Sequence, residues 1–213
     1  ICDRNFIGCD QLIFIEKDNT ADARLKFFNS DGGESGACGN GTRCVADLIS
    51  KENGKKNIIL TTLSGNLKSE ILGNNLVTTE IGKAKTKWNE IPLSNEFDTL
   101  NLNIKINDKK NNEHIGGTAV NVGNPHVIFF VDKVQNFDIT IIGPQLENHN
   151  MFPEKCNVTI AQIINKNLIK VKVWERGAGL TKACGTAACA TVYASVLNNL
   201  TNNNTDIEFE TGK

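Results

Sequence analysis

The stretch KACGTAACAT, residues 182–191, decides the fold, because the chain carries a second version of it, GACGNGTRCV, at residues 36–45. In both versions a small residue precedes Cys-Gly, and a second cysteine follows soon afterwards. An apolar pattern of helical period comes next in each. The sequence therefore predicts two helices, each beginning directly after a Cys-Gly pair.

The apolar stripes predict which side of each helix is buried. The stripe of the first helix contains Val45, Leu48 and Ile49, and that of the second contains Cys189, Val192 and Val196. Free cysteines behave in protein cores as small apolar residues. We therefore expect Cys44 and Cys189, which lie one and a half turns into their helices, to be buried by packing.

The repeat extends beyond these two stretches. Short β-rich runs surround both predicted helices, among them QLIFIE, ARLKFFN, HVIFFVD and LIKVKVW. A turn glycine, Gly65 in the first case and Gly212 in the second, follows the Cys-Gly pair at nearly the same separation. We predict two homologous halves, residues 1–84 and 85–213, each mostly β-strand with one main helix.

Composition limits the classes of partner. The 213 residues carry a net charge of −1, with 22% charged residues, which argues against a nucleic-acid or membrane-surface role. No apolar run approaches the roughly 20 residues of a transmembrane helix. Seven cysteines, an odd number, without a secretion signal favour reduced thiols and a cytoplasmic location.

A zinc site competes for the same cysteines. The Cys-x5-Cys and Cys-x4-Cys pairs could each supply two ligands. Structural zinc sites favour shorter spacings, however, and each second cysteine falls inside a predicted helix. We therefore expect no metal.

A thiol at the start of a helix lies beside unpaired backbone N–H groups and the positive end of the helix dipole, which lowers a cysteine pKa. The glycine that follows lets a ligand approach the backbone, whose N–H groups can hold a carboxylate. Two such turns suggest a cleft with a cysteine on each side. One thiolate would remove a proton from a carbon, and the opposite thiol would return one to the other face. For a single cysteine, a small buried turn residue would be the better interpretation.

The motifs ACGNGTRC, GNPH and ERGAGLTKACGTAACA together resemble the diaminopimelate epimerase family, and the resemblance covers essentially the whole chain. It implies an α/β (α+β) fold of two pseudo-symmetric halves, each a β-barrel-like mixed sheet wrapped around a central helix, with the active site in the cleft between them. It further implies an isomerase of lysine and peptidoglycan precursor synthesis. This enzyme would interconvert LL-2,6-diaminopimelate and meso-diaminopimelate without pyridoxal phosphate or metal, as a homodimer.

The resemblance also implies residue roles. Cys38 and Cys184 would be the two bases, Cys38 acting at the L-centre and Cys184 on the same centre from the D side. Arg176 would clamp the distal carboxylate by bidentate hydrogen bonds, although an arginine before glycine can also be a surface charge. Glu175 would hold the substrate ammonium and, with His126, assist proton transfer. A lone histidine is more often structural, so His126 rests on its GNPH context.

Further matches to the family would bind substrate. Side chains at the polar ends of the substrate would be Gln11, Asn29, Asn124 and Asn157, and the helix N-terminal donors around its reacting carboxylate would come from Gly39, Asn40, Gly185 and Thr186. Because the chain is rich in asparagine, these assignments rest on motif context.

Two alternatives stay open. A proline or hydroxyproline racemase-like isomerase would share the fold and the cysteine pair, but would lack Arg176 in this context. An inactive, truncated binding domain of the same fold is the second, because we expect the family's N-terminal strand and its C-terminal strands to be absent from this chain. The intact Cys38, Cys184, Glu175 and Arg176 argue against it.

Overall fold

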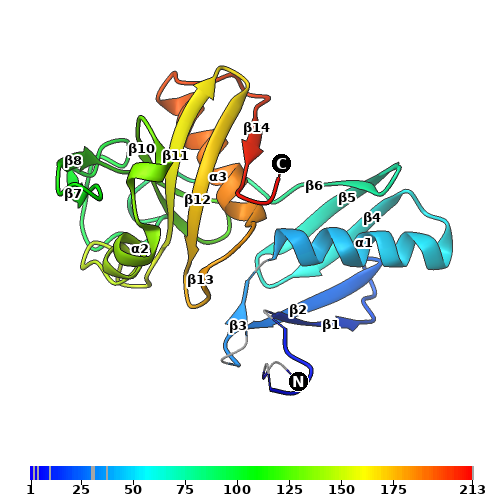
Figure 1. The fold of residues 1–213 in the computed structure, drawn as a ribbon. Coiled ribbons are helices and arrows are strands. Elements are labelled where there is room, and N and C mark those ends of the chain that lie inside the picture. Colours follow the sequence, from blue (N-terminus) through cyan, green and yellow to red (C-terminus); the bar gives the residue numbers. More distant parts are fainter. Residues whose placement is uncertain (2, 4, 10, 30–31, 37, 213) are drawn as a thin grey trace. The chain divides into compact units, whose positions relative to one another are not determined.

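The computed structural model describes residues 1–213 apart from 2, 4, 10, 30–31, 37 and 213, so Cys2 and the alanine before Cys38 lie outside the described residues. The chain divides into two compact units, Ile1–Lys83 and Ala84–Lys213. Figure 1 labels most of their helices and strands.

The first unit is a mixed sheet with one helix packed against it. Its strands run in the order β1-β2-β4-β5-β6, and β3 pairs with β2. The β2–β4 pair is parallel, and the other pairs are antiparallel. The elements are β1 (Gln11–Glu16), β2 (Ala23–Asn29), β3 (Glu34–Ser35), α1 (Gly39–Asn53), β4 (Asn57–Thr62), β5 (Gly65–Gly73) and β6 (Leu76–Thr79).

Helix α1 buries one narrow stripe against this sheet. The buried helix residues are Thr42, Val45, Ala46 and Ile49, at the three- and four-residue spacing of an amphipathic helix. They pack on strand residues that include Leu25, Phe27, Ile58 and Leu60. The predictions that Cys44 and Leu48 are buried are wrong: both are exposed, because they lie on the outer side of the helix, between the buried positions.

The second unit contains a larger mixed sheet and a separate hairpin. The sheet runs β13-β12-β11-β10-β9, with β14 on β12, and β7 pairs only with β8 among the described strands. The elements are β7 (Ile104–Asn107), β8 (Glu113–Gly116), β9 (Thr118–Asn121), β10 (Pro125–Phe130), η1 (Val134–Asn136), α2 (Ile139–Glu147), β11 (Asn157–Asn165), β12 (Leu168–Glu175), β13 (Gly179–Leu180), α3 (Gly185–Leu197) and β14 (Asp206–Glu208).

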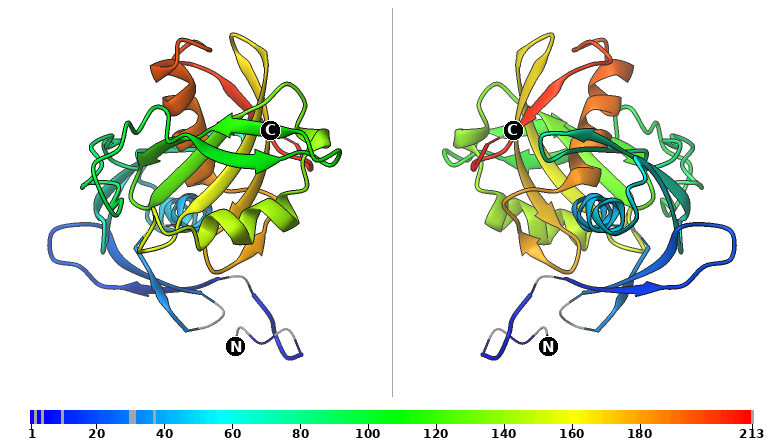
Figure 2. Two further views of the ribbon diagram at one scale, coloured as in Figure 1. Left: turned by 90° about the vertical axis from the view of Figure 1, so that its left-hand side faces the viewer. Right: turned by 90° about the vertical axis from the view of Figure 1, so that its right-hand side faces the viewer.

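Helices α2 and α3 cover opposite faces of this sheet, as Figures 1 and 2 show. Strand β11 is therefore buried on both faces along its first five residues. Its residues alternate: Val158 and Ile160 join the apolar cluster that contains α2 residues, whereas Thr159 and Ala161 point to the other face.

Helix α3 packs through small side chains, and the expected stripe is wrong. The buried residues are Thr186, Ala187, Ala190, Thr191, Ala194 and Ser195. Cys189 is exposed and Val192 is half-buried, because they lie outside this small-residue stripe. The small side chains allow the helix backbone to approach the sheet closely, where larger residues would not fit.

The two units repeat one topology, which confirms the two-half α/β prediction. In the first, β1 is antiparallel to β2, β3 returns along β2, α1 follows, and β4 lies parallel to β2. In the second, β11, β12, β13, α3 and β14 follow the same order and the same directions of pairing. In each unit the helix therefore begins after a short strand that pairs antiparallel with its neighbour, β3 in the first unit and β13 in the second.

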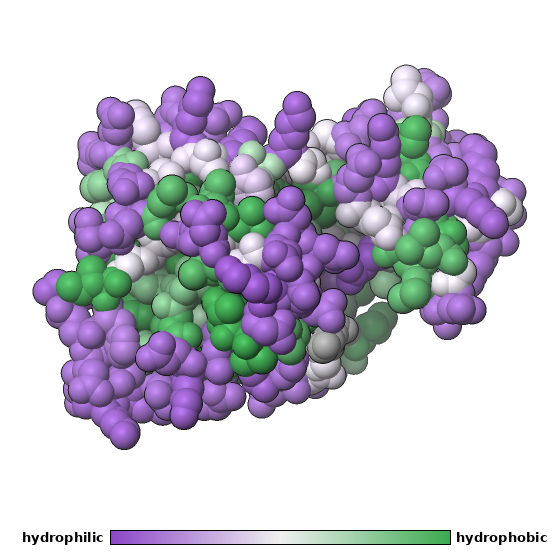
Figure 3. Space-filling view, turned by 90° about the horizontal axis from the view of Figure 1, so that it is seen from above, coloured by the Kyte–Doolittle hydropathy of each residue, from purple (hydrophilic) through white to green (hydrophobic). Residues whose placement is uncertain are grey.

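The described surface is mixed in polarity. Figure 3 shows one face, on which hydrophilic side chains predominate and hydrophobic ones form separate groups. Among the described residues, no helix is both long enough and apolar enough to cross a membrane.

Candidate active site

Cys38 is the N-cap of α1. Its backbone is extended, with φ −143°, and its Sγ accepts a hydrogen bond of 3.3 Å from the N–H of Gly41. A side chain at Gly41 would collide with the Ile13 side chain and lie 3.2 Å from Cys38 Sγ. The glycine therefore lets the first turn of the helix lie directly on the sheet, with the thiol beside it.

Gln11 and Asn29 lie on the α1 side of the same sheet. They are paired across β1 and β2, and Gln11 Nε2 donates a 2.8 Å hydrogen bond to Asn29 Oδ1. Alternation along a strand puts them on the same face as Ile13 and Phe27, whose side chains lie beside Gly41. The two predicted substrate contacts therefore lie on the sheet face that carries the start of α1.

Gly39 and Asn40 form the first turn of α1, where backbone N–H groups lack partners within the helix. The Asn40 side chain is turned along the helix, because its Oδ1 accepts a 2.7 Å hydrogen bond from Arg43 Nη2. An anion would therefore be bound by the backbone N–H groups of these two residues and not by the Asn40 side chain.

Cys184 is the N-cap of α3 and has nearly the same extended backbone as Cys38, with φ −140°. Only 5% of the residue is exposed. Its Sγ lies 3.4 Å from Thr186 Oγ1. Gly185 and Thr186 supply the first helical N–H groups, as in α1.

The thiol of Cys184 is held in its protonated form. Burial, and next the negative charge of Glu175, raise the pKa of Cys184 to about 12, although hydrogen bonds from Thr186 and Ala187 oppose the shift. The expectation of a lowered pKa at the helix start is therefore wrong for this residue, whose pKa is raised. Desolvation of the thiolate and a nearby carboxylate outweigh the favourable hydrogen bonds.

Glu175 and Arg176 occupy the tight turn between β12 and β13. The N–H of Ala178 donates to the carbonyl of Glu175 at 3.1 Å, which closes the turn. Gly177 has φ +75°, a left-handed conformation that favours glycine at the third position of such a turn. The half-buried Arg176 donates from Nη1 to the carbonyl of Glu154 at 2.8 Å.

His126 is fully buried in β10 and neutral at pH 7. Burial, and next the positive charge of Arg176, lower the pKa of His126 to about 3. Its Nε2 lies 2.8 Å from Asn124 Oδ1, which makes Nε2 the protonated nitrogen. Its Nδ1 is buried and has no hydrogen-bond partner among the described residues. His126 can thus accept a hydrogen bond but holds a proton poorly.

Asn157 links this histidine strand to the arginine turn. It pairs with His126 across β10 and β11. Its Nδ2 donates to the carbonyl of Pro125 at 2.9 Å, and its Oδ1 accepts from the N–H of Arg176 at 3.0 Å. The predicted substrate contact is thus already bonded at both amide atoms to the protein's own backbone.

The structure therefore groups the predicted residues by unit. The first unit brings together Gln11, Asn29, Cys38, Gly39 and Asn40. The second brings together Asn124, His126, Asn157, Glu175, Arg176, Cys184, Gly185 and Thr186. Glu147 is a buried acid next to this second group, at the end of α2, and no motif in the sequence predicts it or that helix.

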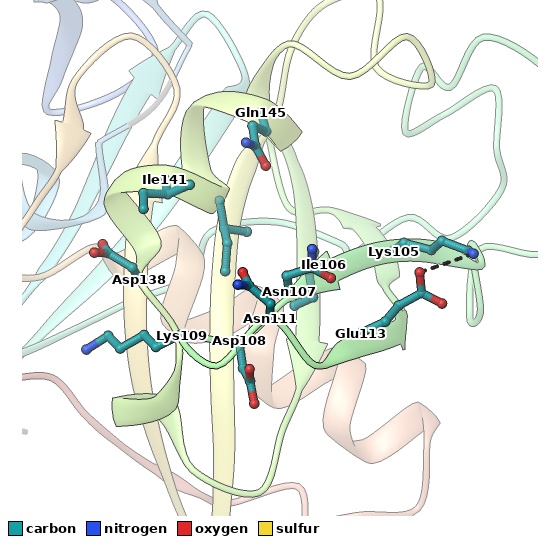
Figure 4. Close-up of a pocket in the computed structure, with 11 residues that line it drawn as sticks. Lys105, Ile106, Asn107, Asp108, Lys109, Asn111, Glu113, Asp138, Ile141 and Gln145 are labelled. Carbon is teal, nitrogen blue, oxygen red and sulfur yellow. Dashed lines mark ion pairs between the residues drawn. The ribbon is translucent and has the colours of Figure 1, made fainter.

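One hollow of the second unit lies away from these residues. It has a volume of about 540 Å³ and lies between the β7–β8 hairpin and α2, as Figure 4 shows. An ion pair of 3.2 Å between Lys105 and Glu113 lies at its side. None of the predicted site residues lines it. In the part of the chain that the structure describes, no three His, Cys, Asp or Glu residues are placed to hold a metal ion.

Sequence comparison identifies close relatives. A family model described as diaminopimelate epimerase matches residues 1–87 and 118–213. A diaminopimelate epimerase of Pelagibacter ubique (strain HTCC1062) is 68% identical over 212 residues, which cover 100% of this chain and 77% of that relative. One of Caulobacter sp. (strain K31) is 45% identical over 210 residues, covering 97% of this chain and 72% of the relative.

Comparison with solved structures agrees at the level of the fold. A hydroxyproline epimerase from Agrobacterium vitis superposes with a TM-score of 0.67 at 13% identity. The match covers 96% of this chain, which spans 65% of that one. The family model and the sequence relatives go further than the fold, and they show that this chain belongs to the diaminopimelate epimerase family and is an isomerase.

Proposed function

We propose that the chain interconverts LL-2,6-diaminopimelate and meso-diaminopimelate, with Cys38 and Cys184 acting on opposite faces of one α-carbon. One observation carries the proposal: the two cysteines cap α1 and α3 at matching points of a repeated topology. Inversion of a carbon needs two such groups, one to take a proton and one to give it.

The proton balance closes over one turnover. In the LL-to-meso direction, the thiolate of Cys38 removes the α-proton and becomes a thiol. The thiol of Cys184 then donates its proton to the opposite face and becomes a thiolate. Loss of a proton from Cys38 to solvent and gain of one at Cys184 restore the first state before the next LL substrate reacts. The raised pKa of Cys184 suits it to start as the donor.

The carbanion formed between these steps places charge on the reacting carboxylate. Backbone N–H groups at the two helix starts would stabilise it, through Gly39 and Asn40 on one side and Gly185 and Thr186 on the other. Such fixed donors need no reorganisation during the reaction.

The remaining residues suit a substrate with an amino group and a carboxylate at each end. We assign Arg176 to the distal carboxylate and Glu175 to the ammonium group, because charge and hydrogen bonding then match. His126 would accept a hydrogen bond at Nδ1, and it would assist the thiols in that way instead of storing a proton. Gln11 and Asn29 add amide contacts.

The decisive experiment follows hydrogen exchange at the α-carbon of LL-diaminopimelate in D₂O. Wild-type protein should form meso-diaminopimelate that carries one solvent deuterium, while unreacted substrate stays protonated early in the reaction. Cys38→Ala and Cys184→Ala should each abolish epimerisation. Cys44→Ala and Cys189→Ala are matched controls, because they change the second, exposed cysteine of each repeat.

Three results would contradict the proposal. The proposal would be wrong if the wild-type protein did not epimerise diaminopimelate. Turnover of proline instead of diaminopimelate would indicate a proline racemase-like activity. Loss of activity in Cys44→Ala or Cys189→Ala equal to that in the two N-cap variants would argue against the assigned pair.

We also propose that the enzyme is cytoplasmic, works as a homodimer, and feeds lysine and peptidoglycan precursor synthesis. Membership of the family supports these points. Light scattering after size exclusion would test the dimer, and fractionation of cells would test the location.

A further inference from the structure

Glu147 is a buried acid outside the set that the family motifs identify. It is the last residue of α2 and is 7% exposed. Its Oε2 accepts a 2.7 Å hydrogen bond from Trp174 Nε1, and its Oε1 accepts a 3.1 Å hydrogen bond from the N–H of Gly177. Lys155 Nζ lies 4.0 Å from Oε1. Both carboxylate oxygens are thus bonded to donors that flank Glu175 and Arg176.

These two bonds hold the turn from both ends. Trp174 is the residue before Glu175, and Gly177 is the residue after Arg176. The Trp174 side chain packs so closely on α2 that even a methyl group at Gly143 would lie 2.6 Å from Trp174 Cβ. The position of the turn is therefore set by α2, through the Glu147 carboxylate and the close contact of helix and indole.

The carboxylate suits this place better than an amide would. Two N–H donors point at it, and an ionised carboxylate accepts at both oxygens, whereas an amide presents one acceptor and one donor group. Its charge also acts locally. Burial, and next the charge of Glu147, raise the pKa of Cys156, while Arg176 lowers it, so Glu147 and Arg176 both lie close to Cys156.

We propose that Glu147 is a positioning residue that holds Arg176 in the geometry needed to bind the distal carboxylate of the substrate. Bidentate recognition by a guanidinium depends on its orientation, which packing and hydrogen bonds to neighbouring residues must fix. This inference rests on the proposed function. In this role Glu147 does not act on the thiols of Cys38 and Cys184 directly. It acts through the turn that carries Arg176.

The test is a double-mutant cycle on full-length chain with LL-diaminopimelate. Glu147→Gln should raise KM about tenfold and change kcat by less than about threefold, since it removes one charge-assisted hydrogen bond and weakens binding. Arg176→Gln should raise KM at least as much. The double variant should be no worse than Arg176→Gln alone, because Glu147 acts through that arginine.

Two further measurements separate positioning from folding. Protection of the Gly177 amide from hydrogen exchange should fall in Glu147→Gln. Trp174→Phe, which keeps an aromatic ring but removes the indole N–H, should raise KM by a smaller factor. It keeps the test available if Glu147→Gln folds poorly. Glu208→Gln is the matched control, because its carboxylate pairs with Lys170 at the other end of β12 and should leave KM unchanged.

The inference would be overturned if the increases in KM of the two single variants added up in the double variant. It would also be overturned if Glu147→Gln left both KM and the protection of the Gly177 amide unchanged. Either result would leave the epimerase proposal intact. Wild-type protein that fails to epimerise diaminopimelate would overturn the proposed function and this inference with it.

Discussion

Gln11 donates a 2.8 Å hydrogen bond from its Nε2 to Oδ1 of Asn29, across the ends of β1 and β2. The equivalent strand ends in the second unit carry Asn157 and Glu175, and Asn157 there accepts from the N–H of Arg176. Both units therefore place bonded polar side chains at the strand ends near their N-cap cysteine.

We predict that the Gln11–Asn29 pair binds substrate as a unit. Gln11→Ala and Asn29→Ala should each raise KM about fivefold, since each loses a contact and frees the partner amide; this corresponds to about 1 kcal/mol. The double variant should show less than the sum of the two effects in steady-state kinetics. Thr61→Ala, which removes another cross-strand hydrogen bond of the same sheet, is the control. Full additivity would contradict the paired role.

Stability at alkaline pH should depend on Cys184. Its pKa is raised from 9.0 to about 12, so the folded state holds the proton more tightly than the unfolded state. The stabilisation is complete below pH 9 and is lost as pH rises towards 12, at up to about 1.4 kcal/mol per pH unit. Urea unfolding from pH 8 to 11 should show a shallower decline for Cys184→Ala than for wild type. Equal slopes would contradict the raised pKa.

Acid should destabilise the protein through His126. Its pKa is lowered from 6.5 to about 3, so the unfolded state binds the proton more tightly. Stability is therefore complete above pH 6.5 and falls as pH decreases towards 3. His126→Gln, which keeps a hydrogen-bond donor for Asn124, should flatten the slope of unfolding free energy between pH 6.5 and 4.5, whatever its absolute stability. A slope identical to that of wild type would show that His126 is protonated normally.

Gly143 should not tolerate a side chain. In a helix interior, alanine normally gives a stability about 1 kcal/mol higher than glycine at the same position. Here a methyl group would collide with the Trp174 ring, so Gly143→Ala should lower stability by about 1–3 kcal/mol in thermal or urea unfolding. Gly116→Ala is the control, because its methyl group would meet no described atom within 4 Å. A Gly143→Ala variant as stable as wild type would mean that the indole can move.

Local signals account for what could be predicted. The starts of α1 and α3 follow from Cys-Gly pairs and apolar periodicity within a few residues, and β1 and β2 coincide with the expected runs QLIFIE and ARLKFFN. Helix α2 was missed because Gly143 and Pro144, inside it, are typical of chain breaks. Its Asp138 N-cap and its packing on Trp174 favour the helix in spite of them.

The sequence alone determined the repeat, the two helix starts with their capping cysteines, and the family, because these depend on neighbouring residues and on specific motifs. Only the tertiary structure decided which face of α3 is buried, since that depends on how closely the helix approaches the sheet. It also decided the protonation of Cys184, because burial and Glu175 outweigh the helix start. The contacts of Glu147 with Trp174 and Gly177 were also decided only by the tertiary structure, because they join segments that lie far apart in the chain.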